Sequence, residues 1–210
     1  MVCFAAVPER NRTMNILIQP TLTLASPSWP ISRSTDVYAA KYIPLGYRIA
    51  SPDELDARRT ARDLKIPTEA AIRIAAPAMA ALIDGPCWLV PIPASDGRLS
   101  ANLALARAIA EMVPGARVKC AIGRARPVES SIHRRWRGLP RLTIDEHAIV
   151  RTAGPMQPLP VYFVDNVITT GTTIAACRRA LGWGTGLLYG DASKPWAPSS
   201  CIKGSLSLGP

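Results

Sequence analysis

The stretch VYFVDNVITTGTT, residues 161–173, decides the fold of this chain. It opens with an apolar run of β-branched and aromatic residues, 161–164, which is typical of a buried strand. Asp165 and Asn166 then place two polar side chains where we expect that strand to end. Residues 169–173 are small and rich in hydroxyl groups around a single glycine. The stretch therefore predicts a strand that runs into a tight turn.

A helix is expected directly after this turn. Ile174, Cys177 and Leu181 are spaced i, i+3 and i+7, and Gly182 follows as a stop signal. The first N–H groups of a helix lack partners inside it, and the helix dipole adds positive charge there, so the turn predicts an anion site. Threonine hydroxyls can donate to phosphate oxygens, and Asp165 can accept from sugar hydroxyls. Together these groups fit a ribose 5-phosphate better than a free phosphate.

Residues 164–173 resemble the phosphoribosyl-pyrophosphate (PRPP) signature of type I phosphoribosyltransferases, in a form similar to orotate and competence-protein-F-type phosphoribosyltransferases. The family pattern is an apolar run, two acidic residues, two apolar residues and then Thr-(Thr/Ala)-Gly-x-Thr. This chain departs from it where Asn166 replaces the second acid. The resemblance implies that Asp165 and Asn166 hold the ribose hydroxyls. It also implies a 5-phosphate cradle made of Thr169, Thr170, Gly171, Thr172 and Thr173.

A second strand–loop–helix unit precedes the signature. Residues 87–93 predict a buried strand, and Ser100 begins a helix with Leu105, Ile109 and Met112 inward. In doubly wound sheets, ligands bind beyond the carboxyl ends of the strands. Taken alone, the intervening loop is equally compatible with an ordinary turn. Ahead of the signature it resembles the Pro-x-Pro pyrophosphate loop of amidophosphoribosyltransferases and competence-type proteins. The resemblance assigns pyrophosphate to Ala94, Ser95, Asp96, Gly97 and Arg98, with Arg98 as a bidentate donor.

The segment from 123 to about 146 has no apolar period, and residues 117–141 hold eight Arg and Lys against one acid, Glu129. Long connections of this kind are usually functional or disordered. One interpretation is a solvated basic loop, or a nucleic-acid contact in which Trp136 stacks on a base. The other is the mobile lid of type I enzymes, which would close a basic side chain over PRPP. The resemblance then adds Arg134, Arg135 and Arg137 to the catalytic candidates.

Composition sets wider limits. The chain has 210 residues and a formal net charge of +10, which fits anionic ligands, nucleotides or nucleic acid without choosing among them. Its five cysteines form no C-x-x-C pair, so we expect no zinc site and a reducing, cytoplasmic location. We see no signal peptide and no apolar run long enough to span a bilayer, so no membrane association is expected.

Several further elements are expected along the chain. Residues 1–34 read as an irregular arm with a short strand at 15–18, and residues 196–210 as a tail. Helices are expected from Ser51 to about 64 and from Pro67 onward, the second with a kink or break at Pro77. Further strands are expected at 117–122, 148–151 and 185–189.

We therefore expect an α/β fold, a doubly wound and mostly parallel sheet of the type I phosphoribosyltransferase kind, over residues 35–195. It would carry a small hood and a long flexible loop at about 123–146. The resemblance implies a phosphoribosyltransferase that binds PRPP with Mg²⁺. Asp165 would contact this Mg²⁺ through ribose hydroxyls or water. The enzyme would transfer the phosphoribosyl group to a nitrogen acceptor and release pyrophosphate. Similar enzymes are often homodimers.

Two alternatives stay open at this point. One is a non-catalytic PRPP- or nucleotide-binding regulator or competence-type accessory protein, and the other is a nucleic-acid-binding protein on this scaffold. If the chain is a catalyst, we expect Asn166→Asp to preserve or raise turnover, because it restores the charge that similar enzymes carry there.

Overall fold

The computed structural model of this protein describes residues 36–44 and 50–192. The chain divides into two units, Met1–Ser32 and Arg33–Pro210, and every described residue belongs to the second. The expected arm at 1–34, its strand at 15–18 and the tail at 196–210 lie outside the described residues. None of the described helices is long and apolar enough to cross a membrane.

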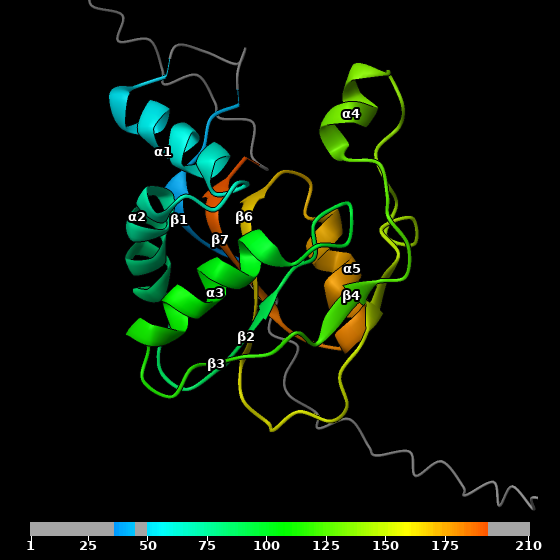
Figure 1. Ribbon diagram of the computed structural model, residues 1–210. Coiled ribbons are helices and arrows are strands. Elements are labelled where there is room, and N and C mark those ends of the chain that lie inside the picture. Colours follow the sequence, from blue (N-terminus) through cyan, green and yellow to red (C-terminus); the bar gives the residue numbers. More distant parts are fainter. Residues whose placement is uncertain (1–35, 45–49, 193–210) are drawn as a thin grey trace, which may run out of the picture. The chain divides into compact units, whose positions relative to one another are not determined.

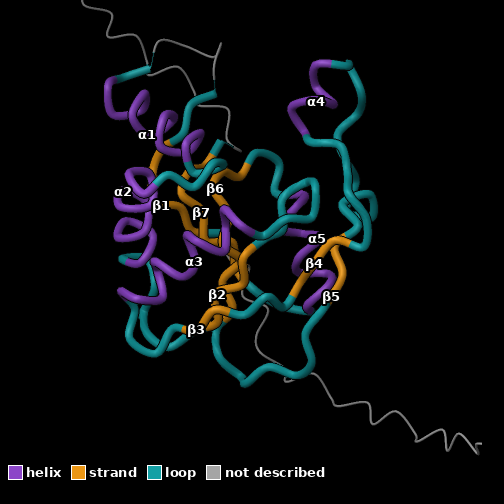
Figure 2. Tube along the Cα trace, in the orientation of Figure 1, coloured by secondary structure: helices purple, strands orange, loops and turns teal. Residues whose placement is uncertain are grey.

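A five-stranded sheet, with every neighbouring pair parallel, forms the centre of the described region (Figure 2). In spatial order its strands are β1 (Val37–Lys41), β7 (Thr185–Asp191), β6 (Val161–Ile168), β2 (Trp88–Pro91) and β3 (Arg117–Val118). The two strands that lead into the predicted ligand loops, β2 and β6, are neighbours in this order. A separate antiparallel pair joins β4 (Ile122–Arg124) to β5 (Ile149–Arg151).

Helices cover both faces of this sheet (Figure 1). On one face lie α1 (Pro52–Asp63), α2 (Glu69–Ala80) and α3 (Ser100–Met112), and on the other lies α5 (Thr172–Leu181) with the β4–β5 pair. The short helix α4 (Ser131–Trp136) stands out from the sheet. The described region is therefore a mixed α/β fold compatible with double winding.

The core consists of two layers, one on each face of the sheet. Val164 and Leu187 pack with α1, α2 and α3, whereas Phe163 and Leu188 pack with α5. Successive side chains of a strand point to opposite faces, and both faces of a parallel sheet are covered, so the strands carry continuous apolar runs. This alternation places residue 165 on the α5 side and residue 166 on the α1 side.

Local signals in the sequence account for most helix ends. Ser51 caps α1 in a capping box with Glu54, and Gly182 ends α5 with a φ of 99°. The second helix begins later than expected, because Thr68 is its cap, and Pro77 lies inside it. Met112 was expected to face inward but is 50% exposed in the last turn of α3.

Three other expectations were wrong in their extent. Strand β6 continues through Asp165 and Asn166 to Ile168, because the backbone of β7 pairs with it as far as Asp191. This backbone pairing does not depend on whether the side chains are polar. Residues 117–122 form no single strand, since β3 and β4 belong to different sheets. The segment 123–146 contains α4, which Ser130 caps by accepting from the His133 N–H at 3.3 Å.

Candidate functional site

The two loops expected to bind PRPP leave the same edge of the sheet. Strands β2 and β6 are parallel neighbours, with Pro91 opposite Val164, so the residues that follow each strand emerge side by side. The Ile92 N–H extends this pairing by donating to the Val164 carbonyl at 3.1 Å. The topology thus places residues 94–98 next to the signature turn, where ligands bind in open α/β sheets.

Gly171 sits at the cap position of α5 with a φ of 76°. This left-handed conformation favours glycine, because a Cβ would crowd the backbone there. The chain then turns into the helix, and the Ala175 N–H donates to the Gly171 carbonyl at 2.9 Å. The hydroxyls of Thr170 and Thr172 are 2.7 Å apart and share a hydrogen bond. The sequence thus builds a helix N-terminus in which hydroxyl groups surround the first backbone N–H groups.

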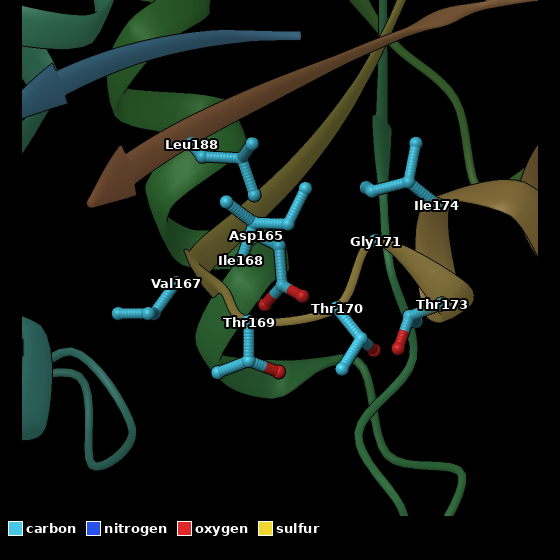
Figure 3. Close-up of a pocket in the computed structure, with 9 residues that line it drawn as sticks. All are labelled: Asp165, Val167, Ile168, Thr169, Thr170, Gly171, Thr173, Ile174 and Leu188. Carbon is cyan, nitrogen blue, oxygen red and sulfur yellow. The ribbon is translucent and has the colours of Figure 1, made fainter. Parts of the chain in front are cut away.

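A small pocket lies in this turn and contains most of the predicted phosphate residues. Asp165, Thr169, Thr170, Gly171 and Thr173 line it together with Val167, Ile168, Ile174 and Leu188. Figure 3 shows the Asp165 carboxylate and the hydroxyl oxygens of Thr169, Thr170 and Thr173 on one side of this group, with Leu188 and Ile174 beyond them. The pocket therefore joins hydroxyl donors to one carboxylate acceptor.

The Asp165 carboxylate is held in a defined orientation. Its Oδ1 accepts from the Asn166 backbone N–H at 2.8 Å and from Nδ2 of Asn102 at 3.1 Å. The same Asn102 amide donates to the Ile92 carbonyl at 2.8 Å, so one side chain of α3 ties the end of β2 to the signature acid. With Oδ1 engaged in this way, Oδ2 is the oxygen left to accept from a ligand.

Burial raises the pKa of Asp165 above its ordinary value. The hydrogen bonds from Asn166 and Asn102 oppose this rise, as do the positive charges of Lys65 and Arg124. Desolvation disfavours the charged carboxylate, whereas donors and nearby cations favour it. The site therefore holds an acid that is easier to protonate than an exposed aspartate.

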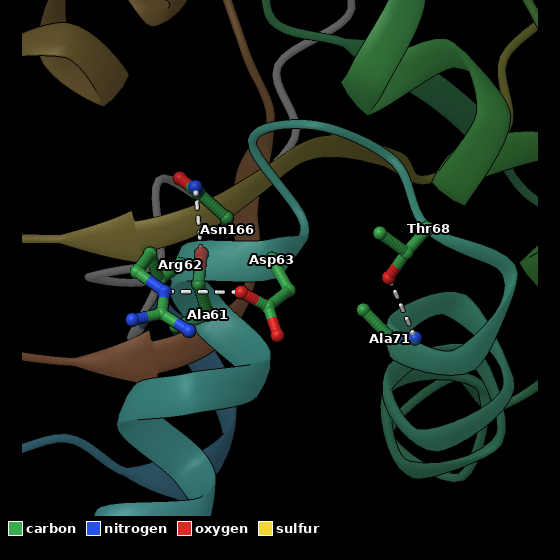
Figure 4. A network of polar contacts seen from close by, with 6 residues as sticks. All are labelled: Ala61, Arg62, Asp63, Thr68, Ala71 and Asn166. Carbon is green, nitrogen blue, oxygen red and sulfur yellow. Dashed lines mark hydrogen bonds and ion pairs between the residues drawn. The ribbon is translucent and has the colours of Figure 1, made fainter.

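Asn166 does not converge with Asp165. Its Nδ2 donates to the Ala61 carbonyl of α1 at 3.3 Å (Figure 4). Its Oδ1 accepts from the Val167 N–H at 2.9 Å. Ala61 is only 1% exposed and lies in the last turn of α1, where carbonyls have no partner further along the helix. The structure thus places the Asn166 amide as a cap on α1 and not in the pocket.

The loop at 94–98 is closed by its own backbone. The Ala94 N–H donates to the Arg98 carbonyl at 2.8 Å, and the Gly97 N–H donates to the Ala94 carbonyl at 2.9 Å. The Ala94 N–H is therefore not free for pyrophosphate as the sequence had suggested, and the N–H groups of Ser95 and Asp96 remain as the loop's donors. The Arg98 side chain is 83% exposed and lies 3.6 Å from Asp96, a weak pairing that leaves its guanidinium accessible.

Arg124, the last residue of β4, connects this loop to the opposite side of the site. Its Nε donates to the Ala94 carbonyl at 2.6 Å, and its Nη1 donates to the His147 carbonyl. Burial lowers the pKa of Arg124, while the negative charges of Asp165 and Asp96 act in the other direction. A half-buried cation whose direct partners are neutral carbonyls adds positive potential beside the pocket.

The three arginines predicted for the lid are not brought to the pocket. All three belong to α4 and its end, which stand away from the sheet (Figure 1). Nε of Arg134 donates to the Pro140 carbonyl at 2.8 Å, and Nη1 of Arg137 lies 3.1 Å from Oε1 of Glu129. Arg135 is exposed. A contact between these side chains and a ligand stays a prediction.

The donors present suit Mg²⁺ of the kind that accompanies phosphate substrates. Mg²⁺ retains several waters and takes one or two carboxylates together with substrate oxygens. Oδ2 of Asp165 and the exposed carboxylate of Asp96 are two oxygen ligands at this edge of the sheet. Within residues 36–44 and 50–192, no cluster of three or more His, Cys, Asp or Glu side chains could hold a metal without such a substrate.

Sequence reasoning did not single out Asn102 or Arg124. Asn102 interrupts an Ala- and Leu-rich helix in its first turn, and such an amide is a poor helix former unless it bonds elsewhere. Arg124 was counted only as part of a basic segment. In both cases the hydrogen-bond partner lies far along the chain, so no local sequence pattern indicated the contact.

No protein-family model matches the chain, and no curated protein matches it either. What the site can bind therefore has to be argued from its residues and their geometry.

Proposed function

We propose that this chain is a phosphoribosyltransferase with a fold of the type I kind, which binds PRPP with Mg²⁺ and transfers the phosphoribosyl group to a nitrogen acceptor. One observation carries the proposal. The Asp165 carboxylate and the threonine hydroxyls of a PRPP-like signature line one pocket at the end of β6, and the end of β2 beside it supplies a second polar loop.

The turn at 169–173 would hold the 5-phosphate. The backbone N–H groups at the start of α5 and the hydroxyls of Thr169, Thr170 and Thr173 can donate to phosphate oxygens, and the helix dipole favours the anion. Gly171 is needed because the turn takes a left-handed conformation and because its missing side chain leaves the approach open.

Asp165 would hold the ribose. Oδ2 accepts from a ribose hydroxyl while Asn102 and the Asn166 backbone hold Oδ1 in place. In the transfer, the bond from C1 of the ribose to the pyrophosphate oxygen breaks, and pyrophosphate leaves with the electron pair. The lone pair of the acceptor nitrogen forms the new bond to C1, and that nitrogen releases its proton. A carboxylate beside the sugar stabilises the positive charge that develops in between.

Pyrophosphate would lie against the loop at 94–98. The Ser95 and Asp96 N–H groups and the Arg98 guanidinium are its donors, and Arg124 adds a second positive charge from behind Ala94. Bound Mg²⁺ would neutralise charge on the pyrophosphate, with Asp165 meeting it through ribose hydroxyls or water. Arg134, Arg135 and Arg137 would close over the ligand only if α4 moves toward the pocket.

A non-catalytic PRPP-binding regulator is the second candidate, and the position of Asn166 favours it. The second acid of the family pattern is absent, and the amide that replaces it bonds to α1. A site of this kind could bind PRPP through the 5-phosphate and pyrophosphate loops without enough negative charge at C1 to promote transfer.

Calorimetric titration with PRPP in the presence and absence of Mg²⁺, followed by pyrophosphate release across a panel of nucleobases, tests the proposal. We expect magnesium-dependent binding and release with at least one base. Binding without release for any base would identify a regulator. No PRPP binding by the folded protein would refute both candidates.

A further inference from the structure

A basic arm projects from the fold and is not accounted for by the pocket. We define the arm as residues 125–142, which leave β4 and contain α4. Its first N–H, that of Ala125, donates to the Ala148 carbonyl at 2.8 Å, so the arm begins at a closed end of the β4–β5 pair. It contains five arginines and one acid, Glu129. Figure 1 shows α4 standing away from the central sheet.

The positive charge of the arm is only partly neutralised. Arg137 pairs with Glu129, whereas Arg134 donates to the neutral carbonyl of Pro140. Among the described residues, no ion pair is recorded for the exposed Arg126, Arg135 and Arg141.

The acids that follow the arm are engaged elsewhere. Asp145 pairs with Arg179 of α5, and the Glu146 carboxylate accepts from the Thr143 N–H at 2.7 Å. Glu146 acts on Arg126 and Arg134 only over a longer range. A net positive surface therefore remains on the arm.

An exposed aromatic ring lies within this basic surface. Trp136, the last residue of α4, is 74% exposed, and Arg135 and Arg137 flank it in the chain. The His133 ring lies beside it, with ring centroids 5.6 Å apart and planes inclined by 35°. Aromatic rings bury more surface than most side chains and are usually covered at least in part. An uncovered tryptophan among arginines offers a stacking face next to anion donors.

We propose that the arm binds single-stranded nucleic acid, with phosphates on its arginines and an unpaired base stacked on Trp136. Sequence-tolerant binding of single strands uses this combination of a basic surface and aromatic side chains. A base in a duplex is already stacked, so Trp136 favours a single strand. A membrane surface is the poorer match, because Trp136 and Leu139 are the exposed large apolar residues among the described side chains of the arm and membrane-bound helices carry a wide apolar face. This binding does not depend on the PRPP proposal.

Fluorescence anisotropy with a labelled oligothymidylate tests the stacking contact. We expect the wild-type protein to bind, and Trp136→Ala to weaken binding by about 5- to 150-fold, the range that corresponds to one lost base–aromatic stack. Trp183→Ala is the matched control, since Trp183 is 41% exposed just beyond the end of α5 and is not part of the arm. It should leave the affinity unchanged. Because Trp136 is exposed, urea unfolding should give the same midpoint for Trp136→Ala and wild type.

The salt dependence of binding tests the phosphate contacts. The double variant Arg126→Ala/Arg141→Ala should reduce the slope of log affinity against log salt by about 1.4, since each phosphate contact on a single strand contributes about 0.7. Arg73→Ala/Arg107→Ala removes two exposed arginines from α2 and α3 and should leave the slope unchanged.

Four results would overturn the proposal. They are the absence of oligothymidylate binding by wild type at low salt, an unchanged affinity in Trp136→Ala, equal affinity for a duplex of the same length, and the same Trp136 dependence with heparin or anionic phospholipid vesicles. The last result would show that the tryptophan serves a polyanion or a lipid surface without bases.

Discussion

Replacing Asn166 by aspartate should destabilise the protein at neutral pH. The Asn166 Nδ2 donates to the buried Ala61 carbonyl at 3.3 Å, and the neighbouring carbonyls of α1 are served by backbone N–H groups from residues 64–66. A carboxylate has no hydrogen to donate, so the Ala61 carbonyl would lose this partner, at a cost of about 1–3 kcal/mol. Its negative charge would also face the negative end of the α1 dipole, which adds about 0.3–1 kcal/mol.

The pH dependence separates the lost donor from the added charge. In the folded variant the new carboxyl group at position 166 would have a raised pKa, because its surroundings favour the protonated form, which can donate to Ala61. The loss of unfolding free energy caused by the ionised carboxylate should therefore be largest above that raised pKa. It should become smaller as the pH falls below the raised pKa toward the pKa of the unfolded chain, about 3.9. Asn166→Ala is the matched control, since it loses the donor without adding charge, and its cost should not change over this range.

Urea unfolding followed by circular dichroism measures both effects. At an m value of about 2 kcal/mol per molar, Asn166→Asp should lower the midpoint at pH 7 by roughly 0.5–2 M, and by less at pH 4.5. A variant as stable as wild type at pH 7 would show that the amide does not cap α1. The turnover expected of Asn166→Asp stays a prediction, which pyrophosphate release by the folded variant tests.

Three further predictions concern the pocket. Gly171→Val should weaken PRPP binding in a calorimetric titration, because a β-branched residue resists a φ of 76°, whereas Gly182→Ala at the other end of α5, with a φ of 99°, should strain the same helix and leave binding unchanged. Asp165→Asn should remove the part of the pH dependence of PRPP affinity that comes from this carboxyl group, and leave the part that comes from the phosphates of PRPP. Because burial raises the pKa of Asp165, the ionised acid costs stability as the pH rises, so this variant should also unfold at a higher urea midpoint at pH 7. Asn102→Ala should lower PRPP affinity about 5- to 10-fold, because it removes a hydrogen bond that orients the Asp165 carboxylate. Asn102→Ser should recover part of this affinity in the same titration.

The sequence predicted the parts of the fold that depend on local chemistry. The two buried strands, the Ser51 cap and the glycine stop of α5 follow from residue types at fixed spacing, and the structure confirms them. The extent of β6 did not follow from such signals. Its last residues are polar or follow polar residues, yet backbone pairing with β7 keeps them in the sheet. The end of β6 is therefore determined by its pairing with the neighbouring strand β7.

The candidate site divides in the same way. A motif of adjacent residues identified the turn at 169–173, and all of its residues except Thr172 line one pocket. Asn102 and Arg124 act on that pocket through partners 63 and 30 residues away in the chain, and no local pattern marks such pairs. The motif also suggested that residues 165 and 166 act together. Once β6 continues past both, the alternation of side chains along a strand separates them onto opposite faces.

The arm and the residue before it are tied to the loop after β2 by two hydrogen bonds. Arg124, just before the arm, donates to the Ala94 carbonyl at 2.6 Å, and Val128 within it donates its N–H to the Ser95 carbonyl at 2.8 Å. A ligand that displaces Arg124 or Val128 either breaks these bonds or carries with it the loop that we assign to pyrophosphate. By linkage, the factor by which a bound oligonucleotide changes PRPP affinity has to equal the factor by which PRPP changes oligonucleotide affinity. The two proposed activities would then be regulated together through two backbone carbonyls, even though their binding residues are separate.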